Sequence, residues 1–190
     1  MHRPFSSQPC SLGADLRALR KTRGLTLAQL AQRLGRSLGW LSQVERDLSG
    51  PSLEDLREIA AALDVPPSML ATQSRAPERE AGFIVRQNGR RPIGKRIPGL
   101  GEELLSPDLT DSIEVVHSTF APNSRLPQPI SRPTQEVGYL VSGCLDLTIA
   151  ERCFTIHPGD SFRIRGETFQ WSNPYDQPAV VIWIIAPPIY

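Results

Sequence analysis

The 190-residue sequence has few of the side chains that metal centres and disulfide frameworks need. Its three cysteines, Cys10, Cys144 and Cys153, are scattered and form no Cys-x-x-Cys pair, and there are only three histidines. Such spacing is typical of unpaired thiols in a reducing compartment, not of a zinc site or a secreted disulfide scaffold. We therefore expect neither a structural disulfide nor a cysteine-bound metal.

Long apolar segments are also missing. No run reaches the roughly 18 apolar residues that a membrane span requires. The first eleven residues, MHRPFSSQPCS, contain no apolar signal core. We predict a disordered leader at 1–11 and a soluble protein of the cytoplasm with no membrane partner.

The sequence has almost no net charge, at +1, but its charges are unevenly distributed. Between Leu12 and Gly50, seven Lys and Arg side chains oppose three Asp and Glu side chains. This local excess of four positive charges is sufficient for contacts with phosphate groups, although it is not a polybasic tail.

The stretch TLAQLAQRLGRSLGWLSQVERDLSGPS, residues 26–52, predicts two short helices joined by a tight turn. Thr26 is a favourable N-cap, and Gln29 three residues later completes a capping box. Apolar residues then recur at helical spacing, and Gly35 can end the helix in a left-handed conformation. Ser37 can cap the second helix. Two short helices that meet at a glycine corner are typical of a DNA-binding helix-turn-helix.

Helical patterns flank this motif on both sides. One covers residues 12–22, and another begins after Ser52, which forms a capping box with Asp55. A short fifth helix starts at Pro66, where the missing N–H costs nothing. The apolar side of the fourth helix is predicted to be buried and comprises Leu53, Leu56, Ile59, Ala60 and Leu63. We predict a five-helix domain over 12–71, followed by a polar linker, TQSRAPEREAG, at 72–82.

Residues 12–71 resemble the λ-repressor-like helix-turn-helix of the xenobiotic-response-element (XRE) regulators. The most specific part is LSQVER followed by PSLEDL; family members usually have glycine where this sequence has Asp47. The resemblance implies that the second helix of the motif, residues 37–46, enters the major groove of DNA. The positions that match base contacts in the family are Ser37, Leu38, Gly39 and Gln43, with Trp40 and Ser42 beside them.

The chemistry of these side chains suits base recognition. The Gln43 amide can pair with an adenine, and Leu38 can contact a thymine methyl group. Trp40 could instead pack on the helix-turn-helix core, and Gln43 could be a solvated surface residue. For Arg46, the alternative is an ion pair with Glu45 or Asp47. The residues expected to contact phosphates are Arg20, Thr26, Arg36 and Arg46.

The second half of the sequence has a different residue pattern, because proline and glycine separate short β-type runs. This spacing predicts a β sandwich or barrel. Residues 180–185 are apolar throughout, which predicts a strand buried on both faces. The runs are GFIVRQ, SIEVVHSTFAP, EVGYLVSGCLDLTI, RCFTIHPGD, SFRIRGETFQWSNP and PAVVIWIIAPP.

Residues 112–188 resemble a small cupin barrel, a jelly roll, through EVGYLVSG, HPGD and WSNP. The resemblance implies a two-domain α + β protein, with a helix-turn-helix domain, a linker and a cupin domain at 83–190. Metal cupins carry an His-x-His pair, a glutamate and a further histidine. Here these positions hold Ile130, Arg132, Glu136 and Gln170, so only Glu136 can bind a metal. We expect no metal, no other cofactor and no catalytic residue, although a tethered cupin isomerase or dioxygenase is an alternative.

Without a metal site, the remaining interior positions predict a small-molecule pocket with a few polar groups in an apolar wall. Arg132 can bind a carboxylate and Glu136 an amine, but the two could also simply pair with each other. The aromatic residues could be core, and the strand pattern does not decide which face Tyr139 occupies. The predicted lining residues are Arg132, Glu136, Gln170, Tyr139, Phe162 and Trp183.

One helix-turn-helix makes few DNA contacts, so we expect a homodimer on a palindromic operator, joined through the cupin sheets. The hypothesis is a transcriptional regulator that acts as a repressor and senses a small effector. In the cupin part, VGYLVSGCLDLTI and IWIIAPPIY resemble repressors of polyamine or amine catabolism, which implies an amine or an amino-acid-like ligand. The alternative is that the cupin serves only for dimerisation.

Overall fold

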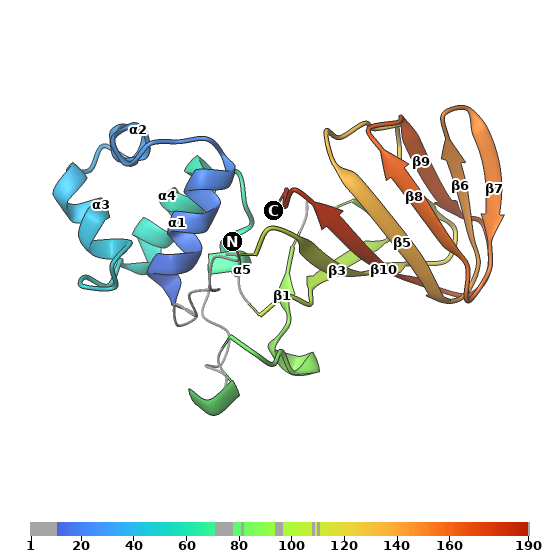
Figure 1. The fold of residues 1–190 in the computed structure, drawn as a ribbon, viewed down its shortest axis with the longest axis horizontal. Coiled ribbons are helices and arrows are strands. Elements are labelled where there is room, and N and C mark those ends of the chain that lie inside the picture. Colours follow the sequence, from blue (N-terminus) through green and yellow to red (C-terminus); the bar gives the residue numbers. More distant parts are fainter. Residues whose placement is uncertain are drawn as a thin grey trace, which may run out of the picture. The chain divides into compact units, whose positions relative to one another are not determined.

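The computed structural model describes residues 11–70, 78–80, 82–93, 97–107, 109 and 111–189. The chain forms two compact units, Met1–Arg91 with Ser106–Asp111 and Pro92–Leu105 with Ser112–Tyr190. The first contains the α-helices and the second contains most of the strands (Figure 1). The predicted leader, apart from Ser11, and most of the predicted linker at 72–82 lie outside the described residues. The domain boundaries stay predictions.

The described part of the first unit has four α-helices of at least seven residues and one α-helix of a single turn. The predicted fifth helix is this four-residue turn. No helix in the described part of the chain is long and apolar enough to cross a membrane. The helices are α1 (Leu12–Thr22), α2 (Leu27–Arg33), α3 (Leu38–Val44), α4 (Leu53–Ala62) and α5 (Pro67–Leu70), with two 3-10 turns, Glu78–Glu80 and Gln87–Gly89, further along the chain.

The predicted helix starts are confirmed by their caps. The Thr26 and Ser52 hydroxyls both form capping boxes, and the Ser37 hydroxyl accepts the Trp40 N–H at 3.1 Å. Leu53 differs from the prediction: it is 66% exposed, because it is the first residue of α4. The buried core of this unit includes Leu16, Leu19, Leu30, Leu41, Val44, Ile59, Leu63 and Met69.

Asp47 stands where the family usually has glycine, and its backbone adopts the left-handed conformation that glycine favours. Its φ of 57° is left-handed, which Asp tolerates better than most residues. Its carboxylate accepts the Ser11 hydroxyl at 2.6 Å and the Gly13 N–H at 2.9 Å. An added Cβ at Gly13 would lie 2.6 Å from the Val44 carbonyl oxygen. The start of α1 and the end of α3 are thus closely packed and bonded to each other.

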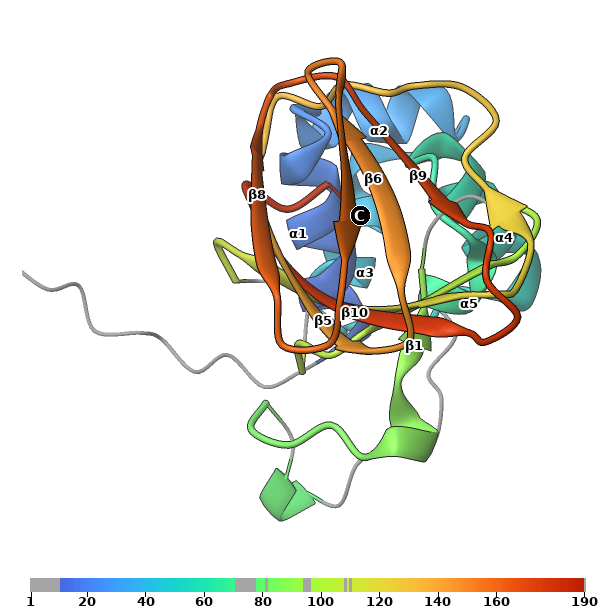
Figure 2. The same ribbon diagram turned by 90° about the vertical axis from the view of Figure 1, so that its right-hand side faces the viewer.

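The second unit is a cupin-like sandwich of two sheets (Figure 2). One sheet has the order β1-β2-β3-β10-β5-β8 and the other β4-β9-β6-β7. No strand pairing among the described residues joins the two sheets, so the predicted barrel is an open sandwich. The strands are β1 (Arg91–Pro92), β2 (Leu100–Leu104), β3 (Glu114–Phe120), β4 (Ser124–Arg125), β5 (Gln135–Ser142), β6 (Leu145–Ile149), β7 (Arg152–Ile156), β8 (Ser161–Arg165), β9 (Phe169–Asn173) and β10 (Ala179–Ala186).

Five of the six predicted β-type runs contain strands of this sandwich, namely β3 and β5–β10. The run GFIVRQ at 82–87 was wrong as a strand: it forms a turn and irregular backbone, and Phe83 is 77% exposed. Conversely, the sequence did not predict β2, whose residues LGEEL lack β-branched side chains. β2 forms because it pairs with β3, so Glu102 lies opposite Ser118.

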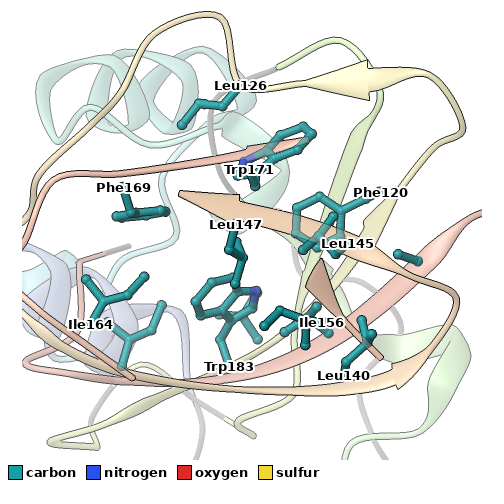
Figure 3. Close-up of a cluster of buried hydrophobic side chains, with 14 residues drawn as sticks. Phe120, Leu126, Leu140, Leu145, Leu147, Ile156, Ile164, Phe169, Trp171 and Trp183 are labelled. Carbon is teal, nitrogen blue, oxygen red and sulfur yellow. The ribbon is translucent and has the colours of Figure 1, made fainter. Parts of the chain in front are cut away.

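The interior of the sandwich is filled by apolar side chains from both sheets (Figure 3). The aromatic rings meet edge to face: Phe120 and Trp171 have centroids 4.7 Å apart, and Phe162 and Trp183 5.0 Å. Such contacts add about 0.5–1.5 kcal/mol to the burial itself. The labelled residues of this core are Phe120, Leu126, Leu140, Leu145, Leu147, Ile156, Ile164, Phe169, Trp171 and Trp183.

Candidate functional site

The residues predicted to contact bases share an exposed edge of α3. Leu38 is 52% exposed, and Gly39 and Gln43 are also exposed. Leu41 and Val44 lie on the buried side of the same helix. The other members of the predicted set are exposed (Ser37) or half-buried (Trp40 and Ser42).

Arg36 lies beside this edge and is held there by two contacts. Its guanidinium donates to the Asp55 carboxylate at 2.6 Å and lies 5.4 Å from the centre of the Trp40 ring. Hydrogen bonds from Ser52, with a smaller contribution from Arg36, hold the pKa of the Asp55 carboxyl below its usual value. The Arg36 side chain is still 46% exposed, so it can reach a ligand from a fixed position.

Arg20, by contrast, does not lie where a phosphate contact was predicted. Its Nε and Nη2 donate to Glu45 at 2.6 and 2.8 Å, and its Nη1 donates to the Leu25 carbonyl at 2.8 Å. The residue is 9% exposed, and the hydrogen bond with Glu45 raises the pKa of its guanidinium. Arg20 is therefore a structural residue that joins α1 to the end of α3.

Thr26 and Arg46, the two other predicted phosphate contacts, are exposed. The Thr26 hydroxyl serves the cap of α2, since it accepts the Gln29 N–H at 3.2 Å. The partners suggested for Arg46 are engaged elsewhere: Glu45 binds Arg20, and Asp47 binds Ser11. Thr26 and Arg46 are therefore accessible from solvent.

In the second unit, the pleat of β5 brings Glu136, Gly138 and Leu140 to the interior. Glu136 is 1% exposed and accepts the Thr134 hydroxyl at 2.6 Å. Its other oxygen lies 3.8 Å from Arg132 Nη1. This is the pairing of Arg132 with Glu136 that the sequence left open, at a distance longer than a hydrogen bond.

Phe162 and Trp183 also lie in the interior. Trp183 is 6% exposed, and Phe162 packs against the core. Gly138 carries no side chain, and an added Cβ there would overlap the Phe162 ring. The glycine thus makes room for Phe162, which in turn supports Trp183.

Two predicted lining residues point elsewhere. Tyr139 lies on the outer face of β5 and is 48% exposed, because neighbouring residues in a strand face opposite sides. Gln170 faces away from its buried neighbours Phe169 and Trp171, and its Nε2 donates to the Leu126 carbonyl at 2.7 Å. Tyr139 and Gln170 therefore do not line the interior of the sandwich.

Two interior glutamates were not predicted. Glu114 is 2% exposed and accepts the Ile189 N–H at 2.9 Å, while Glu102 accepts the Ser118 hydroxyl at 3.3 Å. Glu114 and Glu136 flank the same residue of β10, Ile185. We call Glu102, Glu114 and Glu136 the carboxylate cluster. The sequence of β3, EVVHSTF, does not alternate between apolar and polar residues, so it gave no signal for Glu114, and none indicated Glu102.

Burial raises the pKa of the Glu102 and Glu114 carboxyls. Arg132 opposes this rise at both positions, and the charge of Glu136 adds to it. Among the residues that the structure describes, three carboxylates therefore interact with the Arg132 guanidinium at this end of the sandwich. When all are ionised, the cluster carries more negative charge than Arg132 compensates.

The residues at the usual cupin metal positions do not fit a metal. Ile130 has no donor atom, Arg132 carries a fixed positive charge, and Gln170 turns away from the interior. Within the described ranges, no group of three His, Cys, Asp or Glu side chains is placed to hold a metal ion. We assign no chemical step to a metal.

Both units match known families. Residues 11–73 match the helix-turn-helix domain family, and residues 116–185 match the cupin domain family. The immunity repressor protein of Bacillus phage phi105 is 30% identical over 99 residues, which cover 52% of this chain and 67% of the phage protein.

Other similar proteins are also transcriptional regulators. The HTH-type transcriptional regulator SutR of Escherichia coli is 40% identical over 80 residues, 39% of this chain and 45% of SutR. A solved HTH_3 family transcriptional regulator from Vibrio cholerae covers 94% of this chain and 96% of its own, at 22% identity and a TM-score of 0.44. The chain belongs to the XRE-type helix-turn-helix transcriptional regulators that carry a cupin domain, as the helix-turn-helix match, the repressor relative and the cupin match together show.

Proposed function

We propose that this regulator is a repressor that binds a palindromic operator as a homodimer, senses a small metabolite in its cupin domain, and is not an enzyme. It would act at the nucleoid, in the cytoplasm. The observation that carries the proposal is the exposed edge of α3, residues 38–43, on a helix fixed to the rest of its unit by the Arg20–Glu45 pair. A reading helix has to be both exposed and rigid, since a bound base edge tolerates little displacement.

The side chains along this edge set the proposed contacts. Gln43 would pair with an adenine, Leu38 would contact a thymine methyl group, and Gly39 would allow close approach of the backbone. Phosphate contacts would come from Thr26, Arg36 and Arg46. Ser37, Trp40 and Ser42 would lie at the margin of the contact.

Replacing Gln43 by alanine should weaken binding to an operator selected from a random duplex pool by about 1–3 kcal/mol, because a bidentate contact is lost. Binding to random duplex should hardly change. Fluorescence anisotropy with both duplexes measures the effect. Gln177→Ala, at an exposed position of the cupin domain, is the matched control and should bind as the wild type does. An equal loss on both duplexes would mean that Gln43 does not read bases.

For the sensing domain, the carboxylate cluster favours a ligand with at least one ammonium group. Glu136 is almost fully buried, and Glu114 is similarly buried beside it. An ammonium group would offset the unfavourable burial of these charges. Arg132, with 32% of its side chain exposed, could hold a carboxylate of the same ligand. An amine or an amino-acid-like compound therefore suits this end of the sandwich.

Binding of a diamine, with 1,4-diaminobutane as the probe, should strengthen as the pH rises from 5 to 8. Burial raises the pKa of Glu102 and Glu114, so these carboxyls keep their protons to higher pH than an exposed glutamate does. A bound cation favours the ionised form, so binding releases protons. Titration calorimetry in buffers of different ionisation enthalpy measures that release. Glu102→Gln should reduce the pH dependence, whereas Glu103→Gln, its neighbour in β2, should not. Affinity that is constant or falls with pH would contradict the proposed ligand class.

The tight aromatic packing between Phe162 and Trp183 favours a second candidate, in which the cupin domain only joins two copies. The melting temperature separates the two candidates, because any ligand that binds the folded state raises it. A panel of amines and amino acids that leaves the melting temperature unchanged would support the second candidate.

A further inference from the structure

The chain crosses between its two units at three points, after Arg91, Leu105 and Asp111. The segment Ser106–Asp111 therefore belongs to the helical unit, although it connects β2 with β3 of the sandwich. Leu109, in this segment, is 2% exposed. The β2–β3 connection is thus a buried part of the helical unit that is covalently joined to two paired strands of the other unit.

Asp15, a buried residue of α1, binds the chain at these crossing points. One of its carboxylate oxygens accepts a hydrogen bond from Arg91 Nη1 at 2.5 Å, and the other accepts one from the Leu109 N–H at 3.3 Å. The side chain of Asp15 is 5% exposed and that of Arg91 is 20% exposed, so salt screens this ion pair only weakly. A single carboxylate of α1 therefore holds the chain at the first crossing and between the second and the third.

On the sandwich side, the same crossing points lie next to the carboxylate cluster. Glu102 is three residues before the second crossing, and Glu114 is three residues after the third. Ile93, just after the first crossing, donates its N–H to the Glu102 carbonyl oxygen at 3.0 Å. The Leu105 N–H donates to the Val115 carbonyl oxygen at 2.8 Å. These bonds tie the three stretches of chain together beside the cluster.

α1 is also bonded to the end of α3, the helix proposed to read bases. Arg20, five residues after Asp15, donates to Glu45 at 2.6 and 2.8 Å. The Gly13 N–H donates to Asp47 at 2.9 Å. Energetic coupling is carried by such hydrogen-bond networks and by the rigid elements that they join. The described contacts thus form a continuous series from the carboxylate cluster to α3.

We infer that the Asp15–Arg91 ion pair couples ligand binding at the carboxylate cluster to operator binding by α3. The inference rests on the proposed function and adds the route of regulation. A bound ammonium group replaces repulsion between Glu102 and Glu114 by attraction, which shifts the ends of β2 and β3 next to the crossing points. Asp15 carries that shift to α1. Such coupling is reciprocal, so operator binding also acts on β2 and β3.

Hydrogen exchange of the full-length protein, with and without the selected operator duplex, tests the route without a ligand. Operator binding should alter the exchange rates of β2 and β3 by about threefold or more and leave those of β7, in the other sheet, unchanged. Unchanged β2 and β3 in the bound protein, or an equal change in β7, would overturn the inference. Protein that binds no operator would instead overturn the proposed function. This comparison needs only the wild type, so it holds even where a variant fails to fold.

Replacing Arg91 by glutamine should abolish the exchange effect in β2 and β3. Asp15→Asn should do the same, because it removes the charge and keeps an acceptor for the Leu109 N–H. Arg86→Gln is the matched control, since Arg86 pairs with Glu80 at 2.8 Å, and it should keep the effect. Circular dichroism checks the folding of each variant. A folded Arg91→Gln and Asp15→Asn that both keep the effect would overturn the inference.

The response to a ligand gives a second measurement, with 1,4-diaminobutane as the probe. The diamine should weaken operator binding of the wild type by about tenfold, measured by fluorescence anisotropy. With Arg91→Gln it should still bind the free protein but change operator affinity less than about twofold. A full response in Arg91→Gln would overturn the inference and leave the proposed sensing intact. A wild type that does not respond would overturn the proposed sensing of a diamine, while the exchange experiment still decides the route.

Discussion

Replacing Glu45 by alanine is expected to lower the free energy of unfolding of the helical unit by about 3–5 kcal/mol, because it leaves a buried guanidinium without its partner. Arg20 has 11% of its side chain exposed and Glu45 has 6%, so water cannot replace the two lost hydrogen bonds. The loss is comparable with the whole stability of many domains. Operator binding should fail together with folding.

Chemical denaturation followed by helix circular dichroism gives the magnitude. Arg36→Ala is the surface control: the Arg36 side chain is 46% exposed, so its ion pair with Asp55 should contribute little to stability. A double variant, Arg20→Met with Glu45→Leu, should recover most of the stability because no charge is left unpaired. If the double variant were as unstable as Glu45→Ala, the pair itself, and not the uncompensated charge, would account for the loss.

Replacing Trp183 by alanine should cost about 3–5 kcal/mol of stability, as large-to-small changes of aromatic residues in a core usually do. Trp183 is 6% exposed and has Phe162 at 5.0 Å and Phe169 at 6.5 Å between ring centres. Removal of the indole would leave Phe162 without its edge-to-face contact and Phe169 without its tilted neighbour. This change therefore tests whether the aromatic interior is a packed core.

Thermal and urea unfolding followed by the strand signal measure the effect. Gln177→Ala, at an exposed position of the same domain, is the control and should stay within about 0.5 kcal/mol of the wild type. A cost below about 1 kcal/mol for Trp183→Ala would show that its ring borders open space. That result would favour the sensing role over the purely structural one.

The helical unit could be predicted well because its signals are local. Thr26 with Gln29 and Ser52 with Asp55 lie three residues apart, and each pair forms within a single turn. Arg20 was the exception. Its partner Glu45 is 25 residues away, and a basic residue outside an apolar stripe looks the same in sequence whether it faces a phosphate or a buried carboxylate.

The cupin site was predicted only in part, because its geometry depends on pairing between distant strands. Glu136 and Trp183 lie in the interior, whereas the alternation of the strands turns Tyr139 and Gln170 outward. Glu102 was missed since β2 exists only through its pairing with β3. A run of two glutamates between leucines has no strand signature of its own.

The bond between Arg20 and Glu45 has a consequence for engineering operator specificity. Glu45 directly follows α3. A chimera that imports residues 38–44 from another regulator therefore keeps the native ion pair between Arg20 and Glu45. A longer transplant that replaces Glu45 would need a matching residue at position 20. Cassette exchange in this scaffold should therefore end at Val44.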